Sequence, residues 1–527
     1  MKMQRMSGVR WMLSGLAVGL CAWTTPVARA DDFTGRANAF YADIAQAMRS
    51  DLIVLPAVAK MKPVPASVNR LELAMLLPAG AAGWSEAKAW AEGPEQQAVI
   101  ATIREVTKEE DYRKSMAWGQ PYGATGVSPE LVRARLYTEL GEPPTLGAAQ
   151  FLYLEGLDRV ACLVNVEATR LAADGKVTDA AELLTKWLFL CRQIADREMT
   201  REAAWGLHQM DKAYERLRDV VYMDFRGARK LTTEGLQSVL GRLDDERGYA
   251  GLSRLRIARA DRVAAEQVIS RGLVDRGGVN EATFATTLAR LRTTGKPLRL
   301  FAEAADAKAA SGAHGGFFEA QDALKRAADD FAARWTLNWF DPRMKQPWEY
   351  SRLSPSRHAL VRAAFPDQAE LYNLRQLTQV EAVGTRTALG IYGYVLSNRN
   401  FPPTVSACRP VWIKVVEADP FNPNRDRGRV PEMEYYVPNK VNAKKLDERA
   451  TPQPQRVNVI VPESGLNFSV NVGEDQFIVY SWGSDNAKGW ADRVQNTARV
   501  VQGADYLVWP PVVSLYRQHL TDTGQLK

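Results

Sequence analysis

The chain has 527 residues, of which 46% are hydrophobic and 24% are charged, and this composition excludes an intrinsically disordered or collagen-like protein. The formal net charge is +7, but four of the 68 basic residues and none of the 61 acidic residues lie before residue 31, which leaves a net charge of +3 from Asp31 onward. So small a surplus excludes a protein that binds nucleic acid mainly by charge.

Residues 1–30 have the pattern of a secretory signal peptide. Three basic residues precede an apolar run over 11–23, and the small-residue sequence Ala-Arg-Ala follows at 28–30. We expect cleavage after residue 30. The apolar run is shorter than the roughly 20 residues of a spanning helix, and an uncleaved N-terminal anchor is the alternative. No later stretch reaches membrane length, so we expect a periplasmic or secreted protein without a transmembrane segment after signal removal.

Residues 31–340 are predicted to form a large helical domain. Apolar residues recur at spacings of three and four over 151–168 and again over 183–190, after a break at Asp174-Gly175. We expect these two segments to pair as an antiparallel hairpin. Further helices are expected at 200–222, 232–243, 246–272, 280–293 and 316–338. Successive helix pairs are typical of an α-solenoid, but we find no fixed repeat period, so an irregular bundle is the equal alternative.

Cys162 and Cys191 lie at similar distances from the turn of this hairpin. At about 1.5 Å per residue, each is about 18 to 20 Å from the turn. A disulfide needs Cα atoms within about 7 Å, whereas packed helices have axes 8 to 10 Å apart. An oxidising compartment permits the bond, while the apolar residues beside each cysteine suit two buried thiols. The sequence therefore leaves two alternatives, a Cys162–Cys191 disulfide and a pair of buried thiols.

A linker is predicted over 341–365, which is rich in proline and aromatic residues and lacks a helical stripe. Four aromatic residues lie at or just before it: Trp335, Trp339, Trp348 and Tyr350. Exposed rings of this kind can bind sugars. The alternative is that Trp335 and Trp339, four residues apart, pack on the buried face of a helix.

Beyond the linker, residues 366–515 are predicted to form one long helix on a small antiparallel sheet. The helix is expected over 367–397, before Pro402-Pro403. Short runs rich in Val, Ile, Tyr and Phe predict strands at 433–437, 456–461, 466–472 and 476–482. Residues 516–527 are expected to be a polar tail. The predicted fold class is therefore α+β and mostly α.

Six fragments of residues 366–510 follow one another in a recognisable order. They are 388–392, 400–402, 419–421, 435–436, 480–485 and 504–509. Together with the helix-then-sheet pattern, they resemble the C-terminal lobe of the major pseudopilins of type II secretion systems. Pseudopilins begin with a cleaved glycine and an apolar polymerisation helix, which this chain lacks, and its insert between Phe421 and Phe477 is longer. The resemblance therefore implies a borrowed lobe and not a pilus subunit.

The resemblance also implies a calcium site, because the last loop of the pseudopilin lobe binds calcium through carboxylates and backbone carbonyls. The matching residues are Asp485 and Asp505, with Asp492 as a third in the same loop. Calcium needs six to eight oxygen ligands, which a long irregular loop can supply. The alternative is that these acids only close turns, and three basic residues in the loop oppose a cation.

The chain has no recognisable catalytic motif. It lacks the G-x-S-x-G, P-loop and dinucleotide-binding patterns, and its histidines and cysteines are too far apart in sequence for a recognisable zinc motif. We therefore expect a non-enzymatic exported envelope protein: a helical interaction scaffold with a pseudopilin-like lobe, a protein partner in the envelope and a role in secretion. The alternative is a carbohydrate-binding or carbohydrate-active envelope protein that uses the aromatic residues of 335–350.

Overall fold

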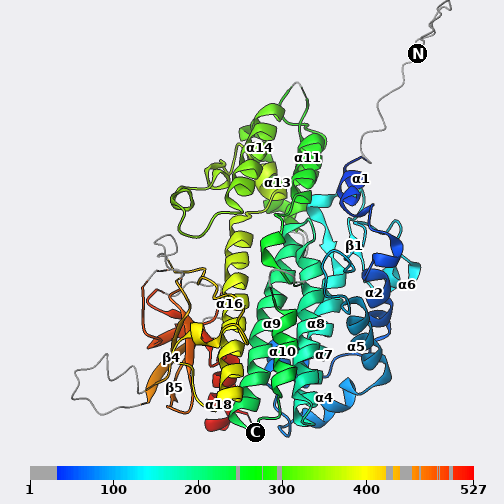
Figure 1. Cartoon of the computed structure of the whole chain (residues 1–527). Helices are drawn as coiled ribbons and strands as arrows, with labels where there is room; N and C mark the ends of the chain where they lie inside the picture. The colour runs from blue at the N-terminus through cyan, green and yellow to red at the C-terminus, as the bar shows by residue number, and fades with distance from the viewer. Residues whose placement is uncertain are drawn as a thin grey trace, which may run out of the picture.

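The computed structural model of the chain describes residues 32–244, 248, 250–275, 277–293, 300–422, 431–438, 454–461, 465–483, 485, 487–497 and 502–526. The predicted signal peptide lies outside these residues. The described residues are mostly helical, with one six-stranded sheet and one short two-stranded ribbon (Figure 1). The expectation of a mostly-α protein with a smaller β part is confirmed. None of the helices in these ranges is long and apolar enough to cross a membrane.

Short helices make up the first part of the chain, on one side of the molecule (Figure 1). They are α1 (Asp32–Asn38), α2 (Asp51–Lys60), α3 (Leu71–Leu76), α4 (Trp84–Ala91), α5 (Pro94–Val106) and α6 (Pro129–Arg133). The small strands β1 (Thr138–Glu139) and β2 (Gln150–Phe151) pair antiparallel after them. α5 shows why these segments fold onto the rest: Val99, Ile103 and Val106 recur at spacings of four and three and are buried.

Four helices form the centre of the bundle: α7 (Leu152–Ala173), α8 (Val177–Ala195), α9 (Thr200–Arg226) and α10 (Thr233–Arg242). α7 and α8 make the expected hairpin, which turns at Gly175 with a φ of +78°, a conformation that favours glycine. α8 packs against both α7 and α9 (Figure 1). Helix lengths range from 5 to 30 residues, so the arrangement is an irregular bundle and not a repeat array.

A second apolar cluster lies at one end of the bundle. It joins α11 (Ala260–Gly272), α12 (Phe284–Thr293), α13 (Leu300–Ala313), α14 (Phe317–Arg334) and α15 (Ala359–Ala364). The helix expected from residue 246 begins only at Ala260. Residues 341–365 are not a free linker, because Tyr350 and Leu353 belong to this cluster. Arg334 also holds the segment by donating hydrogen bonds to three backbone carbonyls of 343–347.

The C-terminal part is built on the long helix α16 (Ala369–Asn398), which packs against α9 on one side and against the six-stranded sheet on the other. The strand order is β3 (Glu434–Tyr436), β6 (Ile478–Ser481), β8 (Asp505–Trp509), β7 (Arg493–Gln495), β4 (Gln455–Val461) and β5 (Leu466–Val472). β3 to β6 match the expected strands. The expectation of an antiparallel sheet is wrong, because β7 runs parallel to both β4 and β8.

The expected polar tail is also wrong, because residues 512–522 form the helix α18 (Val512–Asp522) with five buried side chains. We call residues 32–365 the helical body and residues 366–526 the lobe. One cluster of buried apolar side chains runs from Ala37 in the helical body to Trp509 in the lobe. The two parts therefore share a core, although the sequence pattern changes between them.

Candidate functional site

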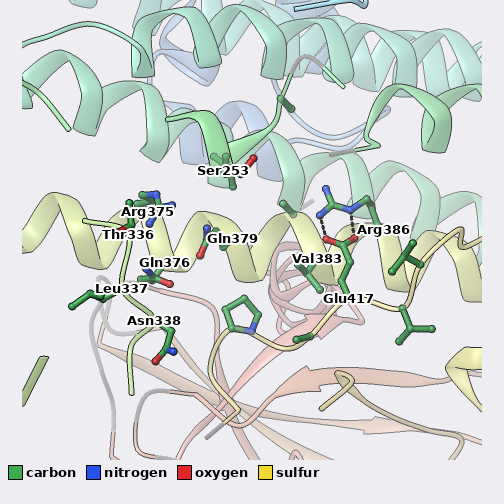
Figure 2. Close-up of a pocket in the computed structure, with 17 residues that line it drawn as sticks. Ser253, Thr336, Leu337, Asn338, Arg375, Gln376, Gln379, Val383, Arg386 and Glu417 are labelled. Atoms are coloured by element: carbon green, nitrogen blue, oxygen red, sulfur yellow. Dashed lines mark hydrogen bonds and ion pairs between the residues drawn. The ribbon is translucent and has the colours of Figure 1, made fainter. Parts of the chain in front are cut away.

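A cleft of about 680 Å³ lies where the helical body meets the lobe (Figure 2). One wall is α16, and the other walls are residues 250–253, the turn 336–338 after α14, and the segment 415–420. Its volume is in the range of small-molecule binding sites. We refer to it as the junction cleft.

The α16 wall is polar because residues at helical spacing face the same side. Arg375, Gln376, Gln379, Val383 and Arg386 recur at intervals of one, three, four and three, which places them along one face of the helix. Figure 2 shows Arg375 and the two glutamines towards one end of this face and Arg386 towards the other. The polar residues of the other walls are Ser253, Thr336, Asn338 and Glu417.

At one end of the cleft, an ion pair fixes the segment 415–420 to α16. The Nε and Nη2 atoms of Arg386 donate to the two carboxylate oxygens of Glu417, each at 2.6 Å. Nη1 of Arg386 also donates to the carbonyl of Leu243 at 3.0 Å. Two-point pairing of this kind is among the strongest polar contacts in proteins. The charges at this end of the cleft are therefore satisfied within the protein.

At the other end, Arg375 is held in place without an acidic partner. Its Nη1 donates to the carbonyl of Trp335 at 2.9 Å, and its guanidinium carbon lies 5.0 Å from the centre of the Trp335 ring. Trp335 is itself fixed, because its Nε1 donates to the carbonyl of Leu255 at 2.8 Å. The Nε atom of Arg375 is buried and has no hydrogen-bond partner in the described chain. Burial, together with the nearby charge of Arg192, lowers the pKa of Arg375.

A buried carboxyl group stands behind the cleft wall. Asp419 lies between two lining residues and is fully buried. Its Oδ1 accepts hydrogen bonds from Ser481 Oγ at 2.7 Å and from the backbone N–H of Phe421 at 2.9 Å, whereas Oδ2 has no partner among the described residues. Burial raises the pKa of Asp419 to about 7. The wall of the cleft therefore contains a group that titrates near neutral pH.

Buried ion pairs fasten the helical body to the lobe beside the cleft. Arg218 of α9 lies 2.5 Å from Glu381 of α16, and Glu381 also accepts a hydrogen bond of 2.6 Å from the Tyr506 hydroxyl of β8. Further along α9, Asp219 accepts two hydrogen bonds of 2.8 Å from Arg517 of α18. Burial opposes the ionisation of Asp219, but Arg517 and Arg216 hold its pKa at about 2. These contacts fix α9 of the helical body against α16, β8 and α18 of the lobe.

The four aromatic residues predicted to bind sugars are packed against other side chains. Trp335 and Tyr350 are buried, and Trp339 and Trp348 are half-buried. Trp339 stacks on Tyr372, and both Trp348 and Tyr350 pack on Phe331. All four rings therefore pack against the protein, although Trp335 and Trp339 follow the end of α14 at Arg334 and do not lie on the buried face of a helix, as the packing alternative had them. Trp335 reaches the junction cleft only indirectly, through its contact with Arg375.

The three acids of the predicted calcium site lie near one another at one end of the sheet, where each accepts hydrogen bonds. Asp505 accepts from the backbone N–H groups of residues 489 and 491, and Asp485 accepts from those of residues 487 and 503. Asp492 accepts from the side chain of Gln455 at 2.5 Å. In the described chain these acids do not form a three-residue metal-binding group. Their oxygens accept hydrogen bonds from backbone N–H groups and from Gln455, and the calcium site stays a prediction of the resemblance.

The cysteines are free thiols in the structure. Cys162 and Cys191 are both buried, with 3% and 0% of their surface exposed. Of the two alternatives that the sequence left open, the structure therefore has the buried thiols and not the disulfide. Burial raises the pKa of Cys162 to about 12. Neither thiol is placed for chemistry, because a reactive cysteine needs an accessible thiolate.

Sequence reasoning did not find the residues of the junction cleft. Arg375, Gln376 and Gln379 can be read in the sequence of α16, but only the fold shows which elements cover them. The wall opposite comes from Thr336 and Asn338, nearly 40 residues earlier in the chain. Comparisons of the chain with protein-family models, with curated proteins and with solved structures find no match.

Proposed function

We propose that the protein is an exported, non-enzymatic binding scaffold of the cell envelope, and that the junction cleft is its binding site. The observation that carries this proposal is the cleft itself: a site of small-molecule size with a mixed polar and apolar lining, with Arg375 buried in its wall and no acid beside it. A buried charge without a partner costs stability. A ligand that supplies the missing acidic partner offsets this cost, and this would explain why the site retains the charge.

The union of the two parts supports a scaffold. Arg218, Glu381 and Tyr506 join α9, α16 and β8 in one buried polar chain. The cleft is lined by residues of both parts, so a ligand in it contacts both at once. Because the two parts are joined, a partner that recognises the lobe would meet the helical body in a fixed orientation. The resemblance of the lobe to major pseudopilins and the signal-like N-terminus support the proposal of a secretion-associated setting with a protein partner.

The test is a crosslinking experiment in intact cells. A photoreactive residue replaces Thr336, which is exposed at the rim of the cleft, or Phe318, which is exposed on α14 away from it. We expect the exported protein to start at Asp31 and to form a crosslinked product through position 336 that position 318 does not give. The proposal fails if the protein keeps its first 30 residues in the cytoplasm, or if both positions give the same products.

A further inference from the structure

We infer that the junction cleft binds the carboxylate group of a small ligand through the guanidinium group of Arg375. This inference rests on the proposed function, because it names the ligand class of the same cleft. It does not depend on where in the cell the protein works.

Arg375 differs from the other buried arginines of the described chain. Seven arginines are buried among the described residues, and six of them have a carboxylate oxygen within 4 Å. Those six are Arg192, Arg197, Arg216, Arg218, Arg334 and Arg517. Arg375 is the exception: it is 6% exposed and forms no ion pair with a described residue. This chain otherwise pairs its buried guanidinium groups with carboxylates, so the missing partner of Arg375 is of the same kind.

The guanidinium group of Arg375 is fixed by the protein on one side only. Nη1 is occupied by the carbonyl of Trp335, and the Trp335 ring supports the group from one side. No hydrogen bond joins Nε or Nη2 to another described residue, and these two atoms form one edge of the planar fork. Such an edge matches the two oxygens of a carboxylate. Because the protein already fixes the fork, little side-chain entropy is lost when a ligand binds.

The lining of the cleft carries a net positive charge. Arg386 and Glu417 neutralise each other, which leaves one uncompensated positive charge, that of Arg375. A single charge suits a singly charged carboxylate better than a phosphate, which carries about −1.5 to −2 at neutral pH. The remaining polar lining is neutral and provides amide and hydroxyl groups from Gln376, Gln379 and Thr336. These groups can bond to the polar body of a peptide or of a sugar acid.

The structure offers a sharp test in Gln379→Glu. Residue 379 follows Arg375 by four positions on α16, so a glutamate there supplies the carboxylate within the protein. The control is Gln321→Glu, an exposed glutamine of α14 that does not line the cleft. Two acid probes, N-acetyl-trialanine and galacturonate, distinguish a peptide source of the carboxylate from a sugar source. N-acetyl-trialanine amide and galactose are their uncharged counterparts, and inorganic phosphate tests the doubly charged anion.

The readout is the melting temperature of the full exported chain with each probe at millimolar concentration. We expect at least one acid probe to raise it by several degrees in the wild type and in Gln321→Glu, and its uncharged counterpart to have no effect. Gln379→Glu should melt higher than the wild type without ligand and should lose the response to the acid.

The inference is overturned if neither acid raises the melting temperature, if an uncharged counterpart or phosphate acts as well as its acid, or if Gln379→Glu keeps the full response. These outcomes leave the proposed function open to its own test, because crosslinking at position 336 does not depend on the charge of the ligand. Conversely, a carboxylate that binds a protein retained in the cytoplasm would refute the proposed function and support the inference.

Discussion

Asp419→Asn should remove a specific part of the pH dependence of folding. Asp419 has its pKa raised from 3.8 to about 7 by burial, so the unfolded chain releases this proton more easily than the folded protein. The stabilisation from the protonated form is complete below pH 4 and is lost as the pH rises to about 7. Between pH 5 and pH 8 the folded protein loses about 2 to 3 kcal/mol through this group. Acidification from pH 8 should therefore stabilise the wild type.

Asparagine is the appropriate replacement because it copies the protonated acid. Its side-chain oxygen can accept the hydrogen bonds that Ser481 and the backbone of Phe421 give to Oδ1, and its amide nitrogen takes the place of Oδ2, which has no partner in the described chain. The assay is urea unfolding followed by tryptophan fluorescence at pH 5 and pH 8. From pH 5 to pH 8, we expect the free energy of unfolding to fall by about 2 to 3 kcal/mol less in Asp419→Asn than in the wild type.

Burial also raises the pKa values of Asp261 and Asp505 to about 6, and their contributions to the pH dependence have the same sign. They are present in both proteins, so the difference between wild type and variant isolates Asp419. The control is Asp179→Asn on the exposed side of α8, which should follow the wild type at both pH values. Parallel behaviour of Asp419→Asn and the wild type would refute the assignment of a raised pKa to this buried carboxyl.

Three further measurements test the core, the buried ion pairs and the metal. Leu188→Ala, at a fully buried position of α8, should cost about 2 to 5 kcal/mol of unfolding free energy in urea, whereas Met223→Ala, which is 49% exposed, should cost less than about 0.5 kcal/mol. Arg517→Leu should lower the unfolding free energy by about 3 kcal/mol, because it leaves the buried carboxylate of Asp219 with one charged partner fewer; an unchanged value would show that this pair does not hold α18. Asp485→Ala should lower the melting temperature of the full chain without calcium, because it removes two hydrogen bonds to backbone N–H groups. If calcium raises the melting temperature of the wild type but not of this variant, the result would support the metal site that the resemblance implies.

The sequence predicted the helices whose apolar stripe is long. The hairpin of α7 and α8, the length of α9 and the position of α16 all follow from spacings of three and four over 15 residues or more. It failed where a short segment depends on distant partners. α18 is held by Arg517, which bonds to Asp219 almost 300 residues earlier, and β7 is a three-residue strand defined by parallel pairing to β4 and β8. Neither relation leaves a local pattern.

The junction cleft could not be predicted for a related reason. A polar residue on a helix is ordinarily assigned to the solvent face, and no local pattern marks Arg375 as buried. In the structure α16 is covered on two sides, by α9 and by the sheet, so several of its polar residues are buried. The charged ones depend on partners from other elements: Glu381 has Arg218 of α9. Arg375 has the carbonyl and ring of Trp335, which come from the turn after α14.

Because α16 packs against α9, the lobe is not structurally separate from the helical body. The change in sequence pattern near residue 365 and the resemblance to pseudopilins both indicated a lobe that could stand alone. In the structure, α16 packs on α9 through Glu381, and β8 contributes Tyr506 to the same buried contact. Cutting the chain before α16 would expose that apolar and charged face and leave Glu381 without its arginine. The helical body therefore completes the core of the lobe, and binding of calcium or of a carboxylate is meaningful only when measured on the whole chain.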